Sequence, residues 1–216
     1  MVDKNVYDAV VIGAGQGGGP LASAMAKSGW RTVLIEREHI GGTCVNTGCT
    51  PTKTMVASAR VAHLVRRAAD FGVRAGDVTV DLETVRRRKR DIVKTFREGS
   101  TRRVEDTPGL DVLIGDAAFT GARELDVKLN DGGAVRINAD RVVINTGARP
   151  LVPRLEGLEN YEHLDSTSIM ELDEVPGKLL VIGGGYVGLE FGQMFRRFGA
   201  KVSIIERGAQ LLSNED

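Results

Sequence analysis

The chain has 216 residues, of which 29 are basic and 29 are acidic, so its formal net charge is zero. A neutral chain has no overall field that would attract nucleic acid, an anionic membrane or an acidic substrate. The N-terminus lacks the pattern of a secretion signal, and no apolar run approaches the roughly 20 residues that span a bilayer. These features predict a soluble, cytoplasmic protein with one or two domains.

The first predicted unit, residues 9–37, recurs at residues 179–207 without a gap. Each copy has an apolar run, the pattern GxGxxG, a helical stretch that ends in glycine and a second apolar run that ends in glutamate. Glu36 and Glu206 each follow the third glycine of their copy by 18 residues. The glycines are Gly13, Gly15 and Gly18 in the first copy and Gly183, Gly185 and Gly188 in the second.

This spacing is typical of dinucleotide binding. The first glycine makes a tight turn, the second lets a pyrophosphate approach the backbone, and the third lets the helix pack against the strand. The helix N-terminus offers amide donors to the phosphates, and the glutamate reaches the ribose hydroxyls. A single GxGxxG could be an ordinary glycine turn, but two complete copies in the same order predict two dinucleotide sites.

Residues 41–53, GGTCVNTGCTPTK, contain the only two cysteines, Cys44 and Cys49. A zinc site needs about four nitrogen or sulfur ligands, and the histidines lack finger-like spacing. These histidines are His39, His63 and His163. Buried inert thiols are disfavoured by the polar, glycine-rich surroundings. We therefore expect no metal site and favour a redox pair.

The spacing of the cysteines constrains this redox hypothesis. Residues five apart in a helix have Cα atoms about 8 to 9 Å apart, beyond the roughly 7 Å limit for a disulfide. The segment must therefore be irregular when oxidised, with Gly48 supplying the freedom and Pro51 suiting the first turn of the next helix. Cys49 is then expected near a helix N-terminus, where a thiolate is favoured. Cys44 is expected further out on the loop, facing substrate.

Two helices are predicted next. Residues 54–70 have the apolar spacing of an amphipathic helix, and residues 81–105 form a highly charged one. The second contains the basic run at 86–90, namely Arg86, Arg87, Arg88, Lys89 and Arg90. A nucleic-acid surface is one interpretation, but no aromatic residues interleave for base stacking, so we favour a solvated helix face.

Short β segments are predicted over residues 110–145, with a hairpin turn at Asn130–Gly133, NDGG. The proline- and glycine-rich stretch TGARPLVPRLEGLEN follows and is typical of a connection between domains. We therefore expect a domain boundary near residue 150.

These motifs together resemble the class I pyridine nucleotide-disulfide oxidoreductases. The resemblance rests on the two GxGxxG patterns, GGTCVNTGCTPTK, the TG of VVINTGARP and Glu190, and it runs from about Tyr7 to the end of the chain. This family includes dihydrolipoamide dehydrogenase, glutathione reductase and mercuric reductase. It implies an α/β fold, with a Rossmann-like FAD-binding domain and β-meander at 1–150 and the start of a second Rossmann-like, NAD(P)-binding domain at 151–216.

The resemblance also implies roles for individual residues. Cys49 would face the flavin, and Cys44 would exchange with substrate. Lys53 would lie near the flavin and pair with Glu190, which would tie the two halves of the chain together, and Tyr186 would cover the nicotinamide pocket. The FAD-binding residues would be Gly13, Gly15, Gly18, Glu36, Gly42, Thr43, Lys53, Ala117, Thr146 and Gly147. The NAD-binding residues would be Gly183, Gly185, Gly188 and Glu206.

Two positions qualify this assignment. Glu206 favours NADH over NADPH because a carboxylate accepts from a free ribose hydroxyl and repels a 2'-phosphate, although the neighbouring Arg207 could accommodate that phosphate. Asn145 stands where the family usually has alanine, a difference that we expect the fold to tolerate.

Members of this family are considerably longer, and their C-terminal dimerisation domain supplies the catalytic histidine and glutamate. We therefore expect these residues to be the flavin and dithiol portion of an NADH-dependent reductase, homodimeric at full length and inactive as this chain alone. Its substrate would be a small-molecule or protein-bound disulfide, a dithiol or a metal ion. The alternative is a non-catalytic nucleotide-binding or interaction module. A flavin monooxygenase or amine oxidase would not need Cys49, so the cysteine motif disfavours it.

Overall fold

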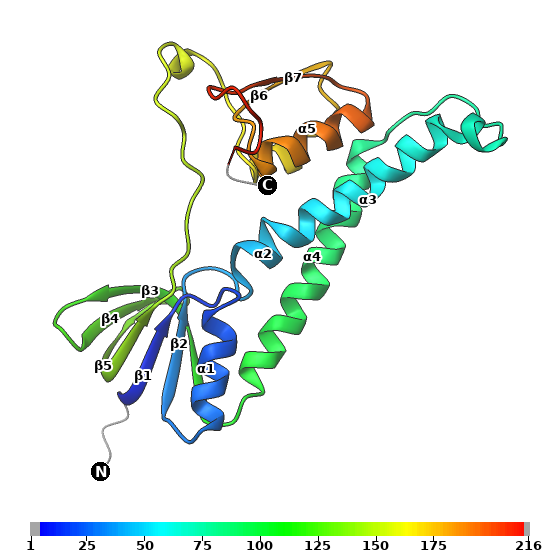
Figure 1. Ribbon diagram of the computed structural model, residues 1–216. Coiled ribbons are helices and arrows are strands. Elements are labelled where there is room, and N and C mark those ends of the chain that lie inside the picture. The colour runs from blue at the N-terminus through cyan, green and yellow to red at the C-terminus, as the bar shows by residue number, and fades with distance from the viewer. Residues whose placement is uncertain (1–4, 214–216) are drawn as a thin grey trace. The chain divides into compact units, whose positions relative to one another are not determined.

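Residues 5–213 are described in a computed structural model of the chain (Figure 1). Contacts divide the chain into two compact units, each made of two segments. The first unit contains the residues up to Cys49 and the segment Val93–Arg149. The second unit contains the segment Thr50–Ile92 and the residues from Pro150 onward. One break between the units falls between Arg149 and Pro150. Residues 50–92, expected in the first domain, are grouped with the second unit by their contacts.

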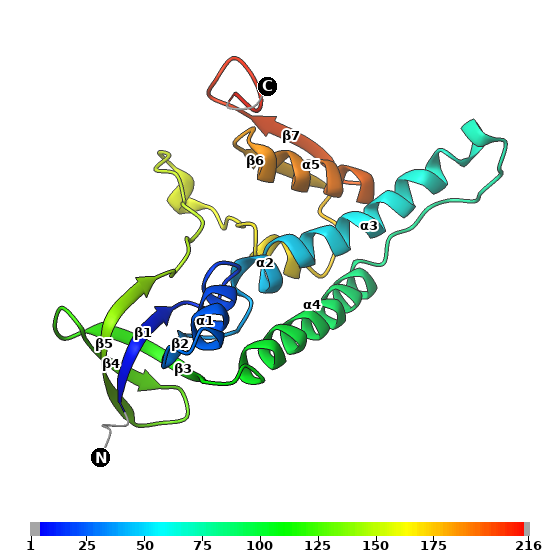
Figure 2. The same ribbon diagram turned by 60° about the horizontal axis from the view of Figure 1, so that its bottom comes forward.

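The first unit is built on five strands and the helix α1. Strand β1 (Val6–Ile12), helix α1 (Gly18–Lys27) and strand β2 (Thr32–Glu36) form a parallel β-α-β unit, with α1 against both strands (Figure 2). The parallel order is β3, β2, β1 and β5, and β4 pairs antiparallel with both β3 and β5, which closes the ring. The remaining strands are β3 (Leu110–Phe119), β4 (Glu124–Leu129) and β5 (Ala134–Ile144).

Strand β3 changes partner along its length. Its first half pairs with β2, and from Gly115 onward it pairs with β4. A Cβ atom at Gly115 would lie 2.4 Å from the carbonyl oxygen of Lys128, so only glycine fits at this change. The predicted hairpin turn is confirmed between β4 and β5, where Gly132 and Gly133 have φ of 107° and 85°.

The core of the first unit lies on both faces of the parallel strands. Successive residues of a strand point to opposite faces, so Val10 and Val33 pack in one cluster and Val11 and Leu34 in another. All four are fully buried. Each such side chain contributes roughly 1.5 to 3 kcal/mol of burial free energy, which explains why these runs are continuously apolar.

The second unit contains a second β-α-β unit packed on the long helices. Its core cluster includes Met55 and Ala59 of α3 and Met194 and Phe195 of α5. Strands β6 and β7 pair in parallel. The elements are α3 (Cys49–Arg66), η1 (Ala68–Phe71), α4 (Leu82–Glu105), η2 (Leu158–Asn160), η3 (Ser168–Glu171), β6 (Lys178–Ile182), α5 (Tyr186–Phe198) and β7 (Lys201–Ile205). Two of these helices are shared between the units, because Cys49 of α3 and the residues of α4 from Val93 onward belong to the first unit.

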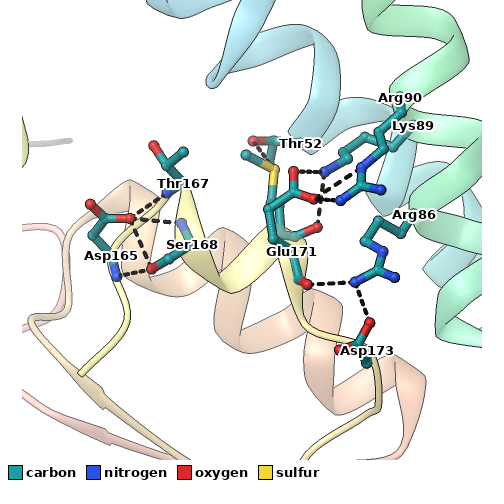
Figure 3. Close-up of polar contacts among 10 residues, drawn as sticks. Thr52, Arg86, Lys89, Arg90, Asp165, Thr167, Ser168, Glu171 and Asp173 are labelled. Carbon is teal, nitrogen blue, oxygen red and sulfur yellow. Dashed lines mark hydrogen bonds and ion pairs between the residues drawn. The ribbon is translucent and has the colours of Figure 1, made fainter. Parts of the chain in front are cut away.

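The basic run on α4 holds η3 in place. Lys89 is buried, donates a 2.9 Å hydrogen bond to the carbonyl oxygen of Met170 and forms an ion pair with Glu171, which also pairs with Arg90 at 2.6 Å (Figure 3). Burial lowers the pKa of Lys89, and its hydrogen bond to Glu171 opposes that effect. Burial would raise the pKa of Glu171, but the hydrogen bonds from Lys89 and Arg90 outweigh it and lower the pKa.

Arg86 also contacts this segment, and we call Arg86, Lys89 and Arg90 with their partner Glu171 the clamp. It donates a 2.7 Å hydrogen bond to the carbonyl oxygen of Glu171 and pairs with Asp173 at 2.5 Å (Figure 3). The expectation of a solvated helix face is therefore wrong for Arg86 and Lys89. These side chains contact residues more than 80 positions further along the chain, which the local charge pattern does not reveal.

Candidate functional site

The two GxGxxG copies have the same strand register. Ala9 pairs with Thr32 in the first copy, and Leu179 pairs with Val202 in the second, so both positions are shifted by 170 residues. The amide of the first glycine makes the same bond in each copy, from Gly13 to the carbonyl oxygen of Ile35 at 2.7 Å and from Gly183 to that of Ile205 at 2.8 Å. The sequence repeat is thus a repeat of backbone geometry.

The glycines act in the same way in both turns. Gly13 and Gly183 have φ of 100° and 105°, a left-handed conformation that favours glycine. A Cβ atom on Gly18 would lie 1.9 Å from the carbonyl oxygen of Gly13, and one on Gly188 would lie 2.3 Å from that of Gly183. The third glycine therefore lets each helix approach the turn. Gly185 immediately precedes α5 as its N-cap.

The glutamate of each copy fixes the turn next to it. Glu36 accepts a 2.8 Å hydrogen bond from the amide of Ala14 and a 3.0 Å bond from the amide of Glu38. Glu206 accepts equivalent bonds from Gly184 at 2.7 Å and Gly208 at 2.9 Å. The Gly208 and Gly184 amides lower the pKa of Glu206. Sequence reasoning assigned both carboxylates to ribose and missed this backbone role, which the identical spacing in the two copies could have indicated.

The start of the cysteine segment packs onto the first turn. The amide of Gly41 donates to the carbonyl oxygen of Ala14 at 2.9 Å, and Gln16 donates from its side chain to the carbonyl oxygen of Gly41 at 3.2 Å. A Cβ atom on Gly42 would lie 2.5 Å from the Cα atom of Gly15. This approach leaves a backbone cradle with no room for side chains, which fits the pyrophosphate of a dinucleotide.

Each cysteine lies on its own helical segment. Cys44 is half-buried within the short helix α2 (Gly42–Asn46), so the expectation that it lies on a loop is wrong, while Cys49 is exposed as the first residue of α3. Gly48 separates the helices, but its φ is not left-handed; a Cβ atom there would lie 2.9 Å from the carbonyl oxygen of Thr43. Gly48 is therefore required for close approach, and Pro51 lies in the first turn of α3 as expected.

Lys53 and Glu190 form an ion pair with Nζ and Oε1 2.5 Å apart. Their side chains are 64% and 28% exposed, and exposed pairs contribute at most about 1 kcal/mol to stability. The expected pairing of Lys53 with Glu190 is confirmed, and it links α3 to α5 across residue 150 of the chain. Both residues belong to the second compact unit.

The other expected site residues lie at element ends or on strand surfaces. Thr146 and Gly147 are exposed after the end of β5, and Gly147 has a φ of 72°. Ala117 is half-buried on β3 opposite Val127. Thr43 is exposed on α2, and Tyr186 is 73% exposed as the first residue of α5.

A cavity of about 640 Å³ lies in the second unit. Arg66 in its wall donates to the carbonyl oxygens of Arg197 and Phe198, at the C-terminal end of α5. Cations at this position compensate the negative end of a helix dipole. The cavity contains none of the expected site residues; its lining is His63, Arg66, Gln193, Arg196, Arg197 and Gly199.

Neither a metal cluster nor a membrane span is found in the described part of the chain. Within residues 5–213, no three His, Cys, Asp or Glu side chains come together to hold an ion. No helix in the same range combines the length and apolar character needed to cross a bilayer.

Comparison with known proteins identifies the relatives of this chain. The family model described as pyridine nucleotide-disulphide oxidoreductase matches residues 7–216. A probable pyridine nucleotide-disulfide oxidoreductase, RclA of Escherichia coli strain K12, is 40% identical over 98% of this chain and 45% of its own length. A mercuric reductase of Streptomyces lividans is 37% identical over 97% of this chain and 44% of its own length.

A solved structure shares the fold. The copper(II) complex of the HOCl-induced flavoprotein disulfide reductase RclA from Escherichia coli has a TM-score of 0.84 and 38% identity. The match covers 98% of this chain and 45% of that one, so the chain spans about half the length of the relatives that it matches. The fold is the expected mixed α/β fold, and the chain belongs to the pyridine nucleotide-disulphide oxidoreductase family.

Proposed function

We propose that this chain is the FAD- and dithiol-bearing portion of an NADH-dependent disulfide reductase. The observation that carries the proposal is the shared backbone geometry of the turns at 13–18 and 183–188, each fixed by a glutamate. Two such turns suit two dinucleotides, and the cysteine segment begins directly on the first of them. We assign FAD to the first turn and NADH to the second.

The residues of the first turn would hold the FAD pyrophosphate. The glycine backbone offers amide donors without side chains in the way, and Glu36 lies beside the turn where ribose hydroxyls are recognised. The other residues of the first unit proposed for this site are Gly42, Thr43, Ala117, Thr146 and Gly147. When bound, FAD supplies two-electron transfer between a nicotinamide and a disulfide.

The two cysteines would carry the electrons to the substrate. A disulfide between Cys44 and Cys49 takes up two electrons and two protons and becomes two thiols, and the reverse reaction restores it. Cys49 is exposed as the first residue of α3. We assign Cys49 to the exchange with the flavin and Cys44 to the exchange with substrate. Lys53 lies one helical turn along α3 from Cys49 and is held by Glu190.

The second turn would bind NADH in preference to NADPH. Glu206 stays ionised below the usual pH range of a glutamate because its pKa is lowered by backbone amides. An ionised carboxylate favours a free ribose hydroxyl and repels a 2'-phosphate. Tyr186, exposed at the start of α5, is proposed to cover the nicotinamide position.

The substrate class follows from the thiol chemistry. We propose a small-molecule or protein-bound disulfide, a dithiol or a thiophilic metal ion as the substrate, with a homodimer as the full-length form. The acid and base for thiol exchange are proposed to lie in the rest of the full-length protein. This chain alone is then expected to bind its cofactors and to accept electrons without sustained turnover.

The proposal is tested with FAD-reconstituted protein under anaerobic conditions. Addition of one equivalent of NADH should reduce the Cys44–Cys49 disulfide by way of the flavin. It should leave the flavin oxidised and produce a long-wavelength band that depends on Cys49. Cys49→Ser should show no band. Cys44→Ser has a free Cys49 thiol from the start, so it should show the band before NADH is added and should not reduce a model disulfide. Protein that binds no FAD, or a band that survives Cys49→Ser, would contradict the proposal. FAD and NADH binding without electron transfer would instead support a non-catalytic nucleotide-binding module.

A further inference from the structure

Asn145 follows β5 directly and lies beside the first glycine turn. Its backbone amide donates a 2.8 Å hydrogen bond to the carbonyl oxygen of Ile12, which continues the parallel pairing of β5 with β1. This pairing places Asn145 next to Gly13. A Cβ atom on Gly13 would lie 2.3 Å from the carbonyl oxygen of Asn145, so backbone and side chain of Asn145 both adjoin the turn.

The carboxamide of Asn145 lies among the glycines of the turn. Its Nδ2 donates to the carbonyl oxygen of Gly13 at 3.3 Å. A Cβ atom on Gly18 would lie 2.8 Å from Nδ2, one on Gly15 would lie 3.7 Å from Nδ2, and one on Gly17 would lie 3.1 Å from Oδ1. The half-buried amide of Asn145 therefore occupies the space next to Gly15, Gly17 and Gly18, which have no side chains. An alanine at position 145 would be too short to reach this space.

This contact matters because the turn is unusually rich in glycine. Residues 13–19 include five glycines, and glycine loses more backbone freedom on ordering than any other residue. A ligand that must order such a turn binds more weakly by the free energy of that ordering. A ligand that binds to an already ordered turn avoids this loss of affinity. The Glu36 carboxylate accepts a hydrogen bond from the Ala14 amide, and the Asn145 amide donates one to the Gly13 carbonyl oxygen. These two bonds restrain neighbouring residues of the turn.

We propose that Asn145 is a positioning residue of the first dinucleotide turn, which its side-chain amide orders for the pyrophosphate before the cofactor binds. The inference rests on the proposed assignment of FAD to this turn. It goes beyond that assignment because it gives a role to a side chain that is neither in the GxGxxG pattern nor next to it in sequence.

Two substitutions test the inference by titration of the apoprotein with FAD, followed by flavin fluorescence. Asn145→Ala removes the donor and the amide, and the Kd for FAD should rise about tenfold. Asn145→Asp keeps the shape but places a carboxylate against the Gly13 carbonyl and the entering phosphates, so the Kd should rise about 30-fold. The melting temperature of each apoprotein is measured alongside to separate affinity from stability.

Asn130→Asp is the matched control. Asn130 also donates from its side-chain amide to a backbone carbonyl, that of Arg37 at 2.8 Å, in the same unit but on the β4–β5 turn. The same chemical change there should leave the Kd for FAD within about twofold of wild type. An equal loss in both Asn→Asp variants would overturn the inference.

A pH series distinguishes positioning from a merely structural role. In the Asn145→Asp variant, the introduced carboxyl group can again donate to the Gly13 carbonyl once it is protonated. The Kd ratio of Asn145→Asp to wild type should therefore fall as the pH is lowered from about 6 to about 4, through the usual pKa of an aspartate. The ratio for Asn145→Ala should stay constant, and Glu36, which faces the turn from β2, is present in every protein and cancels in both ratios.

The outcomes separate this inference from the proposed function. Wild-type protein that binds no FAD overturns the proposed function. Wild-type protein that binds FAD, with both Asn145 variants binding equally well, overturns this inference alone. A lower melting temperature with an unchanged Kd would likewise overturn it, because it would show a purely structural role.

Discussion

The turn at residues 13–18 and the turn at residues 183–188 share one backbone framework but have different surroundings. The first turn is contacted by the Asn145 carboxamide and closely approached by Gly42. In the second, a Cβ atom on Gly183 or Gly185 would meet nothing within 4 Å among the described residues, and the contacts fall on Gly184, through Leu211 and the amide of Leu212.

This difference suggests how one framework serves two cofactors. The strand register, the glycine conformation and the glutamate bonds are common to both turns, so we expect them to set the geometry of the two proposed dinucleotide sites. The segment that follows the second strand also bonds each turn in a similar way, from the Gly41 amide to the Ala14 carbonyl and from the Leu212 amide to the Gly184 carbonyl. The Asn145 carboxamide contact is described for the first turn. We expect the Asn145 contact to order the first turn before the proposed FAD binds.

The largest expected effect comes from Gly18→Ala. A methyl group 1.9 Å from the Gly13 carbonyl oxygen cannot be accommodated, so the first unit should lose about 3 kcal/mol or more and FAD binding should be abolished. Gly188→Ala should have the corresponding effect on NADH binding alone. Urea unfolding and separate titrations with each cofactor measure both effects.

Gly99→Ala is the control for these glycine variants. Gly99 lies within α4, and a Cβ atom there would meet nothing within 4 Å. Alanine at this position should stabilise the protein by about 0.5 to 1 kcal/mol and leave both cofactor affinities unchanged. If Gly188→Ala abolished FAD binding as well, the assignment of one cofactor to each turn would be wrong.

The next effect concerns the clamp that supports the second unit. Glu171→Gln leaves the buried Lys89 ammonium without its counter charge, and we expect a loss of about 2 kcal/mol, below the range for fully buried pairs because Glu171 is 45% exposed. The loss should appear in unfolding of the second unit, with FAD affinity unchanged. Glu98→Gln, in the exposed pair with Lys94, should change stability by less than about 0.5 kcal/mol.

The glutamates provide a paired comparison. Glu206→Gln replaces one acceptor oxygen by an amide that cannot accept from Gly184 or Gly208, so the Kd for NADH should rise about tenfold. Discrimination against NADPH should also weaken because the negative charge is removed. Glu36→Gln should raise the Kd for FAD by a similar factor and leave NADH binding unaffected. Unchanged NADPH discrimination in Glu206→Gln would contradict the role of this carboxylate.

The smallest effects are expected in the pH dependence of stability. The lowered pKa values of Glu171 and Glu206 mean that their stabilisation is complete above about pH 4.5 and is lost as the pH falls through the lowered values. Burial, with the hydrogen bond to Asp111, raises the pKa of Tyr7 from 10.0 to about 12. The stabilisation by Tyr7 is therefore complete below about pH 10 and is lost as the pH rises toward 12.

The two units should accordingly differ in their response to pH. The second, with Glu171 and Glu206, should weaken first in acid, and the first, with Tyr7, should weaken in alkali. Probes in each unit during pH-dependent unfolding would measure this. Tyr7→Phe removes the ionisable group and should reduce the loss of stability at alkaline pH. If the variant lost as much stability as wild type, a group other than Tyr7 would be responsible.

Local patterns predicted much of this structure. Both β-α-β units, the hairpin at Asn130–Gly133 and the long charged helix were predicted from spacing, because each depends on neighbouring residues. The family and the mixed α/β fold were predicted from the motifs and are confirmed by the family match and the related solved structure.

Contacts between distant segments could not be predicted in the same way. A basic residue on a charged helix has no local feature that distinguishes a solvated side chain from Lys89, whose acidic partner lies 82 positions away. The same limit applies to Asn145, which was noted only as a departure from alanine, and to the grouping of residues 50–92 with the second unit. Such contacts depend on packing across the fold, which periodicity does not encode.

The central claim is that each turn holds its own dinucleotide, and amide hydrogen exchange with each cofactor tests it most directly. FAD should slow exchange at residues 13–18 and 41–43, where the cysteine segment contacts the turn, and NADH should slow exchange at residues 183–188. Protection of the second turn by FAD, or protection of neither turn by its assigned cofactor, would contradict the account.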